Sequence, residues 1–110
     1  MQQISAPQLK QWLNESLTGT RPKPQLLDVR EPWELDVCRL ADVKSMPMRS
    51  VPARYLELDR DDEIVVICHH GARSYQVAMF LEQQGFSKIL NLHGGVAAWA
   101  QQVDAAMPTY

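Results

Sequence analysis

Near the middle of the chain, the residues Ile64-Val65-Val66-Ile67-Cys68-His69-His70-Gly71-Ala72-Arg73-Ser74 combine an apolar run with a short polar loop. The first four residues of this stretch are β-branched and apolar, and they predict a strand that is buried on both faces. A helical pattern begins after the loop. Because Cys68 follows the strand directly, in a short loop that contains Arg73 and leads into a helix, the stretch predicts a thiolate and anion site.

The segments on either side of this stretch alternate between predicted strands and predicted helices. Apolar runs predict further strands at 25–29, 43–46 and 87–92, of which 43–46 is the weakest. Helices are predicted from the Ser5 cap to Gly19, from Pro32 to Val37, from Pro52 to Leu58, from the cysteine loop to Gly85, and from Gly94-Gly95 through Val103. This alternation predicts an α/β fold with a parallel sheet that helices cover on both faces.

Some residue types that can carry chemistry are better explained by packing. Trp12, Trp33 and Trp99 stand at helix-compatible positions beside apolar residues, so we expect all three in the core. Cys38 lies in an apolar segment and is expected to pack as a small hydrophobic residue. The alternative for Cys38 is a resolving thiol that forms a reversible disulfide with Cys68.

Length and composition predict a single domain. The chain has 110 residues, 45% of them hydrophobic, which is enough for one compact core over residues 1–110 and too little for two. No internal repeat or low-complexity block divides it. We expect residues 104–110 to form a frayed tail, as termini without tethering do.

The charge balance and the cysteine content exclude several classes of protein. Eleven basic and thirteen acidic residues give a formal charge of −2, so no overall positive field exists to hold nucleic acid or an anionic membrane. The longest apolar stretches are far shorter than a membrane span, and the first residues lack the features of a signal peptide. Two cysteines are too few for a disulfide scaffold, so we expect a cytoplasmic protein in a reducing compartment.

The loop from Cys68 to Arg73 has the chemistry of an anion cradle. Its six residues lead into a helix, so several backbone N–H groups are expected to turn inward and add to the positive end of the helix dipole. A cysteine in such a place has its pKa lowered from about 8.5 to between about 3.5 and 7.5. Gly71 permits a backbone angle or a close approach that a side chain would block. We favour a reactive thiolate over the alternative of a small buried hydrophobic residue.

Arg73 has two candidate roles in this loop. It either contacts a bound oxyanion or ties the loop down through a carboxylate. Asp28 is the best candidate for that carboxylate, because it falls at the end of another predicted strand. Arg30 and Glu31, where a strand meets a helix, are expected to form caps or local ion pairs rather than to bind a ligand.

The histidines raise the question of a metal site. His69 and His70 adjoin Cys68, but adjacent side chains in a tight loop rarely converge on one ion, and His93 adds no ligand spacing. We therefore expect no metal and no cofactor. His69 and His70 either line the mouth of a pocket, where they influence the choice of donor or acceptor, or are solvated loop residues.

Three motifs resemble the successive hallmarks of single-domain rhodaneses: Asp28-Val29-Arg30-Glu31-Pro32-Trp33-Glu34, then Val65 to Ser74, then Leu92-His93-Gly94-Gly95-Val96-Ala97-Ala98-Trp99. The resemblance implies a three-layer sandwich with a mostly parallel five-stranded sheet, and sulfur transfer through a persulfide on Cys68. It implies that the loop main chain and Arg73 cradle the transferred sulfur or the anionic group of the donor. The implied site is Cys68, supported by Asp28 and Arg30, with the loop residues His69, His70, Gly71, Ala72, Arg73 and Ser74.

The resemblance leaves three classes of function open. The first is a sulfurtransferase that takes sulfur from a donor such as thiosulfate and passes it to a thiol, cyanide or protein acceptor. The second is a protein-interaction or regulatory module on the same scaffold, and the third is a phosphatase or arsenate reductase. Phosphatases of this type use Cys-x5-Arg, whereas Cys68 to Arg73 is Cys-x4-Arg, a smaller ring that suits one added sulfur atom. The chain departs from the family at 39–43, where the usual Pro-Gly turn is missing.

Overall fold

The unbroken apolar residues of β4 (Ile64–Ile67) place this strand in the middle of a parallel sheet. The structure, a computed structural model, describes residues 1–110. The sheet has five strands in the order β1-β5-β4-β2-β3, and every neighbouring pair is parallel. The other strands are β1 (Gln2–Ile4), β2 (Gln25–Asp28), β3 (Lys44–Ser45) and β5 (Ile89–Leu92). The α/β fold with a parallel sheet, expected from the sequence, is confirmed.

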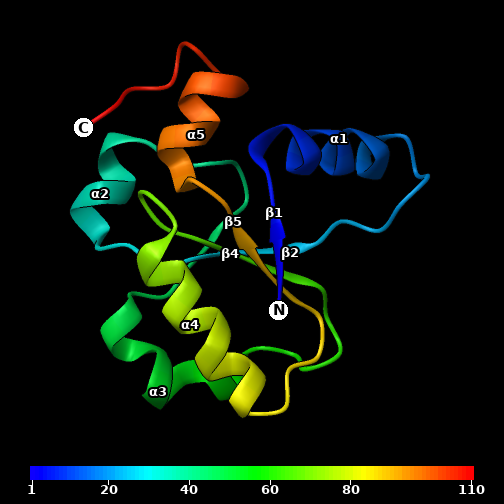
Figure 1. Ribbon diagram of the computed structural model, residues 1–110, viewed down its shortest axis with the longest axis vertical. Coiled ribbons are helices and arrows are strands. Elements are labelled where there is room, and N and C mark those ends of the chain that lie inside the picture. Colours follow the sequence, from blue (N-terminus) through cyan, green and yellow to red (C-terminus); the bar gives the residue numbers. More distant parts are fainter.

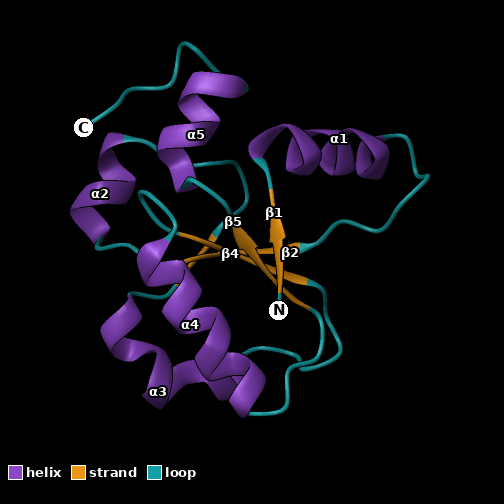
Figure 2. Ribbon diagram, viewed as in Figure 1, coloured by secondary structure: helices purple, strands orange, loops and turns teal.

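Helices cover both faces of this sheet and complete a three-layer sandwich. Figures 1 and 2 show α1 and α5 on one side of the sheet and α3 and α4 on the other. The helices are α1 (Ala6–Leu17), α2 (Pro32–Val37), α3 (Val51–Arg54), α4 (Ala72–Gln83) and α5 (Gly95–Gln102), with 3₁₀ turns at Met48–Ser50 and Tyr55–Glu57. None of the helices has the length and apolarity needed to cross a membrane.

The strand β4 contributes to two separate cores. Val65 and Ile67 pack in the layer that contains Trp12 of α1, whereas Ile64 and Val66 pack in the layer beneath α4. All four β4 side chains are fully buried, as the sequence predicted. Burial of an aliphatic side chain contributes about 1.5–3 kcal/mol, so β4 anchors both layers and holds the residue that follows it.

The two edge strands differ from the sequence expectations. β1 was not expected, because Gln2 and Gln3 are polar, exposed residues of an edge strand and show no apolar run. The strand expected at 43–46 is limited to Lys44–Ser45, which pairs with β2 at the opposite edge. Apolar periodicity detects the buried central strands because burial is what creates the pattern.

The tryptophans do not all lie in the core. Trp12 and Trp99 are buried as expected, but Trp33 is 60% exposed. Trp33 lies in the first turn of α2, a helix of six residues that buries Glu34 and Leu35 instead. The expectation for Trp33 was therefore wrong, since so short a helix has one narrow buried side and Trp33 lies outside it.

Candidate active site

The candidate site lies at the carboxyl ends of β2, β4 and β5. Asp28 is the last residue of β2, and Cys68 directly follows β4. Gly94, at the N-cap of α5, and Gly95, its first residue, lie in the turn that follows β5. Because the strands are parallel, their ends meet at one edge of the sheet, which is where such folds bind ligands.

Cys68 is held in a polar cage although its side chain is nearly inaccessible. It is 1% exposed, and the backbone N–H of Gly71 donates to its Sγ at 3.0 Å. The Ser74 Oγ lies 3.2 Å from the same sulfur. Gly71 has a φ of 101°, a left-handed angle that favours glycine and that turns its N–H toward the sulfur. α4 starts at the next residue, so the cage lies at the positive end of a helix.

The start of α5 supports the cysteine loop from behind. The N–H of Val96 donates to the carbonyl of Cys68 at 3.0 Å, and that of Ala97 donates to the carbonyl of His69 at 3.1 Å. Gly95 lies so close to this loop that a Cβ there would collide with the carbonyl oxygens of Cys68 and His69. The third hallmark of the sequence thus contributes a tight strand-to-helix turn that braces the loop.

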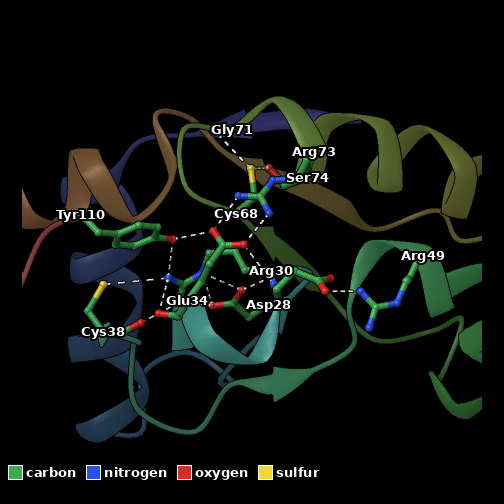
Figure 3. Close-up of polar contacts among 11 residues, drawn as sticks. Asp28, Arg30, Glu34, Cys38, Arg49, Cys68, Gly71, Arg73, Ser74 and Tyr110 are labelled. Carbon is green, nitrogen blue, oxygen red and sulfur yellow. Dashed lines mark hydrogen bonds and ion pairs between the residues drawn. The ribbon is translucent and has the colours of Figure 1, made fainter. Parts of the chain in front are cut away.

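Arg73 ties the loop to α2, but its partner is Glu34 and not Asp28. The two guanidinium nitrogens donate to the two carboxylate oxygens of Glu34 at 2.7 and 2.8 Å. Asp28 is occupied by Arg30, whose Nη2 lies 2.7 Å from its Oδ2 and whose Nε lies 2.9 Å from its Oδ1. The prediction of an Arg73–Asp28 pair was wrong, because the turn that follows β2 folds Arg30 back onto Asp28. Figure 3 shows both pairs.

Glu34 is the electrostatic centre of the network around the loop. Its hydrogen bond with Arg73 lowers its pKa from 4.5 to about 2 despite the opposing effect of burial. It also accepts from the Tyr110 hydroxyl at 2.7 Å and from the N–H of Glu31 at 3.1 Å. A carboxylate with so many donors stays ionised and holds Arg73 in one orientation.

The tail at 104–110, expected to fray, packs onto the site instead. Met107 is buried, and the Tyr110 hydroxyl accepts from Arg30 Nη1 at 2.9 Å while it donates to Glu34. Burial raises the pKa of Tyr110 to about 12, so its hydroxyl keeps the proton that it donates. The Tyr110 ring stacks on His69 with 3.9 Å between centroids. These tertiary contacts tether the segment, which no local pattern in the sequence indicates.

The histidines of the loop have different surroundings. His69 is sandwiched between the rings of Tyr110 and His70, and its pKa is lowered by burial and by the neighbouring His70. His70 is exposed. Both line a cavity of about 250 Å³, together with Cys38, Val96, Ala97, Gln101, Pro108, Thr109 and Tyr110. They therefore line a pocket, and their influence on the choice of donor or acceptor stays a prediction, whereas His93 is exposed outside the pocket.

Cys38 and Arg30 behave as structural residues in this arrangement. Cys38 is buried in a hydrophobic core with its thiol free, and its Sγ lies 3.9 Å from Arg30 Nη1. Arg30 is fully buried and also donates to the Cys38 carbonyl at 2.8 Å. The expectation that Cys38 packs and that Arg30 forms a local ion pair is confirmed. No three His, Cys, Asp or Glu side chains converge in a way that could hold a metal ion.

Three residues of the site were missed in the sequence. Glu34 stands within the first hallmark but shows no sign of its partner there. Asn91 interrupts the apolar run of β5, and a buried amide in a central strand is a signal that was available. Its side chain contacts Ser74 and, at 3.2 Å, the carbonyl of Gly71. Tyr110 has no sequence signal, because only the tertiary structure brings it to Glu34.

Comparison with known proteins agrees with this geometry. The Rhodanese-like domain family matches residues 5–102. A sulfurtransferase of Allochromatium vinosum is 42% identical over 76 residues, which are 69% of this chain and 71% of that protein. The thiosulfate sulfurtransferase GlpE of Pseudomonas aeruginosa is 33% identical over 75 residues, which are 68% of each chain.

Solved structures show the same relationship. A rhodanese-related protein of Thermoplasma volcanium superposes with a TM-score of 0.81 at 30% identity, and the match covers 94% of both chains. A rhodanese-like domain protein of Staphylococcus aureus superposes with a TM-score of 0.78 at 28% identity, over 90% of this chain and 91% of that one. Because the family matches residues 5–102, and the cysteine loop and its support from α5 agree with that match, the chain belongs to the family of rhodanese-like domains.

Proposed function

We propose that this protein is a sulfurtransferase that moves a sulfane sulfur from a donor such as thiosulfate to a thiophilic acceptor through a persulfide on Cys68. The observation that carries the proposal is the position of Cys68 Sγ, which accepts from the Gly71 N–H at 3.0 Å beside the start of α4. Preorganised donors of this kind stabilise negative charge on sulfur. The sulfurtransferase names of relatives in Allochromatium vinosum and Pseudomonas aeruginosa support the reaction class.

The reaction proceeds in two displacements on sulfur. In the first, the Cys68 thiolate attacks the outer sulfur of thiosulfate, a new S–S bond forms, and sulfite leaves with the electron pair of the broken S–S bond. In the second, a thiol, cyanide or protein nucleophile attacks the outer sulfur of the persulfide. The Cys68 thiolate then leaves with the electron pair of that bond. The protein returns to its starting state without a cofactor.

The remaining residues of the site have positioning roles in this proposal. Arg73 is held by both oxygens of Glu34, so it fixes the end of the loop rather than standing free for an anion. The backbone N–H groups at the start of α4 then supply the attraction for a transferred sulfur.

The two free cysteines suit a reducing compartment such as the cytoplasm, where Cys68 keeps its reactivity.

Intact-mass measurement after treatment with thiosulfate tests the proposal. The wild-type protein is expected to gain one sulfur atom and to lose it again when cyanide is added. Cys68→Ser is expected to fold and to gain nothing. Cys38→Ser is the matched control and gains sulfur as the wild type does, because Cys38 lies in the core. The proposal would be overturned if the folded wild-type protein gained no sulfur. It would also be overturned if the Cys38→Ser variant gained none.

A further inference from the structure

A chain of buried polar groups leads from Cys68 to the middle of β5. The Cys68 Sγ lies 3.2 Å from the Ser74 Oγ, and the Ser74 Oγ is hydrogen-bonded to the Asn91 Oδ1. We propose that Asn91 is a positioning residue that restrains ionisation of Cys68, because it competes with the sulfur for the single hydroxyl proton of Ser74. This role rests on the proposed function, since it concerns the same sulfur that would carry the persulfide.

The contacts of Asn91 determine which end of its amide faces Ser74. The Nδ2 lies 3.2 Å from the carbonyl oxygen of Gly71, which can only accept a hydrogen bond. It also lies 3.0 Å from the Oε1 of Gln3 on β1. With its NH₂ committed to these two acceptors, Asn91 presents its carbonyl oxygen to Ser74.

Proton counting then sets the direction of each hydrogen bond. The Asn91 Oδ1 has no proton, so Ser74 must donate its only hydroxyl proton to Asn91. Ser74 keeps a lone pair that accepts from the S–H of Cys68. Ser74 is fully buried and Asn91 is 2% exposed, so solvent offers neither an alternative partner. The polar groups of Cys68, Ser74 and Asn91 therefore all have hydrogen-bond partners when Cys68 is a neutral thiol.

Ionisation of Cys68 disturbs this arrangement. When the S–H bond breaks, the proton leaves to solvent and the sulfur, which keeps the electron pair, becomes an acceptor only. The Gly71 N–H still donates to it, but Ser74 reaches the sulfur only by turning its proton away from Asn91. If the Ser74 hydroxyl rotates toward the sulfur, the buried Oδ1 of Asn91 is left without a donor. If the hydroxyl does not rotate, its oxygen lone pair faces the negatively charged sulfur. Either outcome has a cost.

The restraint applies to the free thiolate and not to the persulfide. In a persulfide the sulfur bonded to the Cys68 Cβ has no proton, and the negative charge resides on the outer sulfur. Ser74 can therefore keep its hydrogen bond with Asn91. Asn91 thus favours the thiol at rest, which limits unwanted alkylation and oxidation, and it does not oppose the loaded state.

The pH profile of alkylation of Cys68 by iodoacetamide tests the proposal, in a Cys38→Ser background that leaves one thiol. Asn91→Leu removes the competing acceptor, so the midpoint of the profile is expected to fall by about one pH unit, with about tenfold faster alkylation below the midpoint. Asn91→Asp is the matched control. It loses the same donor to Gly71 but keeps an oxygen for Ser74, so its midpoint stays at or above that of the parent.

The Ser74→Ala background separates this role from a structural one. Asn91→Leu is expected to cause no further shift of the midpoint when Ser74→Ala is already present, because no hydroxyl proton remains to be released. A midpoint that falls with both Asn91 variants, or a shift by Asn91→Leu that persists without Ser74, would overturn the proposal. Alkylation requires no sulfur donor, so this result stands apart from whether thiosulfate loads Cys68.

A second measurement applies even if Asn91→Leu does not fold. The S–H stretching band of Cys68 is recorded by infrared spectroscopy in the Cys38→Ser protein, at a pH below the alkylation midpoint. It is expected at the frequency of a hydrogen-bonded thiol. Ser74→Ala is expected to move the band to the frequency of a free thiol. A band that does not respond to Ser74→Ala shows that the thiol does not donate to Ser74, and this result contradicts the proposal.

Discussion

Two arginine–carboxylate pairs belong to one hydrogen-bond network in the site, and they differ in what they connect. Asp28 and Arg30 are two residues apart, and neither side chain is exposed. Glu34 and Arg73 are 39 residues apart, and the Arg73 side chain is 36% exposed. The first pair closes a turn within one segment, whereas the second joins α2 to the cysteine loop. The more exposed pair is thus the one that holds the cysteine loop, whereas the fully buried pair has both partners at the end of β2 and in the turn that follows it.

The largest effect on stability is expected from Asp28→Asn. This change leaves the fully buried Arg30 guanidinium without its carboxylate, and the loss of one partner of a buried pair costs about 3–5 kcal/mol. Urea unfolding measures the loss as a lower midpoint. Asp42→Asn is the control, because the Lys23–Asp42 pair is exposed and its removal is expected to leave the midpoint almost unchanged. Equal losses in the two variants would remove the distinction between buried and exposed pairs.

Of the two pairs, the one formed by Glu34 and Arg73 is expected to matter more for sulfur transfer, and Glu34→Gln tests this. Glutamine keeps the shape of Glu34 but weakens its hold on Arg73, so the end of the cysteine loop shifts. A small misplacement of a reacting group lowers rates by up to about a hundredfold, and we expect sulfur loading of Cys68 to slow by about tenfold to a hundredfold. Time-resolved intact mass measures this rate. Faster loading in Glu34→Gln than in a folded Asp28→Asn protein would contradict the comparison.

Much of the site was predictable because its signals are local. The apolar run of β4, the cysteine directly after it and Gly71 lie within eight consecutive residues, Ile64–Gly71. The burial of β4 and the left-handed backbone angle of Gly71 follow from these local signals, and the structure shows both. The parallel sheet also brings Asp28 to the same edge as Cys68, as expected. The buried central strands, and therefore the residues that follow them, are features that apolar patterns encode.

The partners of the two arginines were not predictable in the same way. The sequence paired Arg73 with Asp28 because both stand at the expected edge, yet the outcome depends on which charge Arg30 takes. Tertiary packing places Glu34 of α2 beside Arg73. It also sets the path of the tail that brings Tyr110 to Glu34. A sequence pattern contains residue types and spacings, but not the distances between segments that are far apart in the chain.

The pH dependence of stability separates the Glu34 contribution from the rest of the site. The pKa of Glu34 is about 2 in the folded protein against 4.5 for an ordinary glutamate. As pH falls below 4.5 the unfolded chain binds the proton first, so this contribution to stability is complete above 4.5 and is lost toward about 2. Urea midpoints across this range are expected to fall more steeply in the wild type than in Glu34→Gln. Parallel curves would show that Arg73 does not hold the carboxylate.

The smallest effect is expected from Tyr110→Phe, which disconnects the two pairs without removing either. The change deletes the hydroxyl that accepts from Arg30 and donates to Glu34, but it keeps the ring that stacks on His69. Both charged partners retain other hydrogen bonds, so we expect a loss of about 1 kcal/mol in the free energy of unfolding. Tyr75→Phe is the control, because Tyr75 is exposed on α4 and its hydroxyl has no hydrogen bond.

A double-mutant cycle shows to which pair Tyr110 belongs. If its hydroxyl acts through the loop, Tyr110→Phe has little further effect on sulfur loading once Glu34→Gln is present, because the link from Glu34 to Arg73 is already weak. In the Asp28→Asn protein, Tyr110→Phe is expected instead to slow sulfur loading by the same factor as it does in the wild type. Additive effects on loading with Glu34→Gln would show that the Tyr110 hydroxyl acts independently of Glu34, and the two pairs would then be energetically separate despite the hydroxyl that joins them.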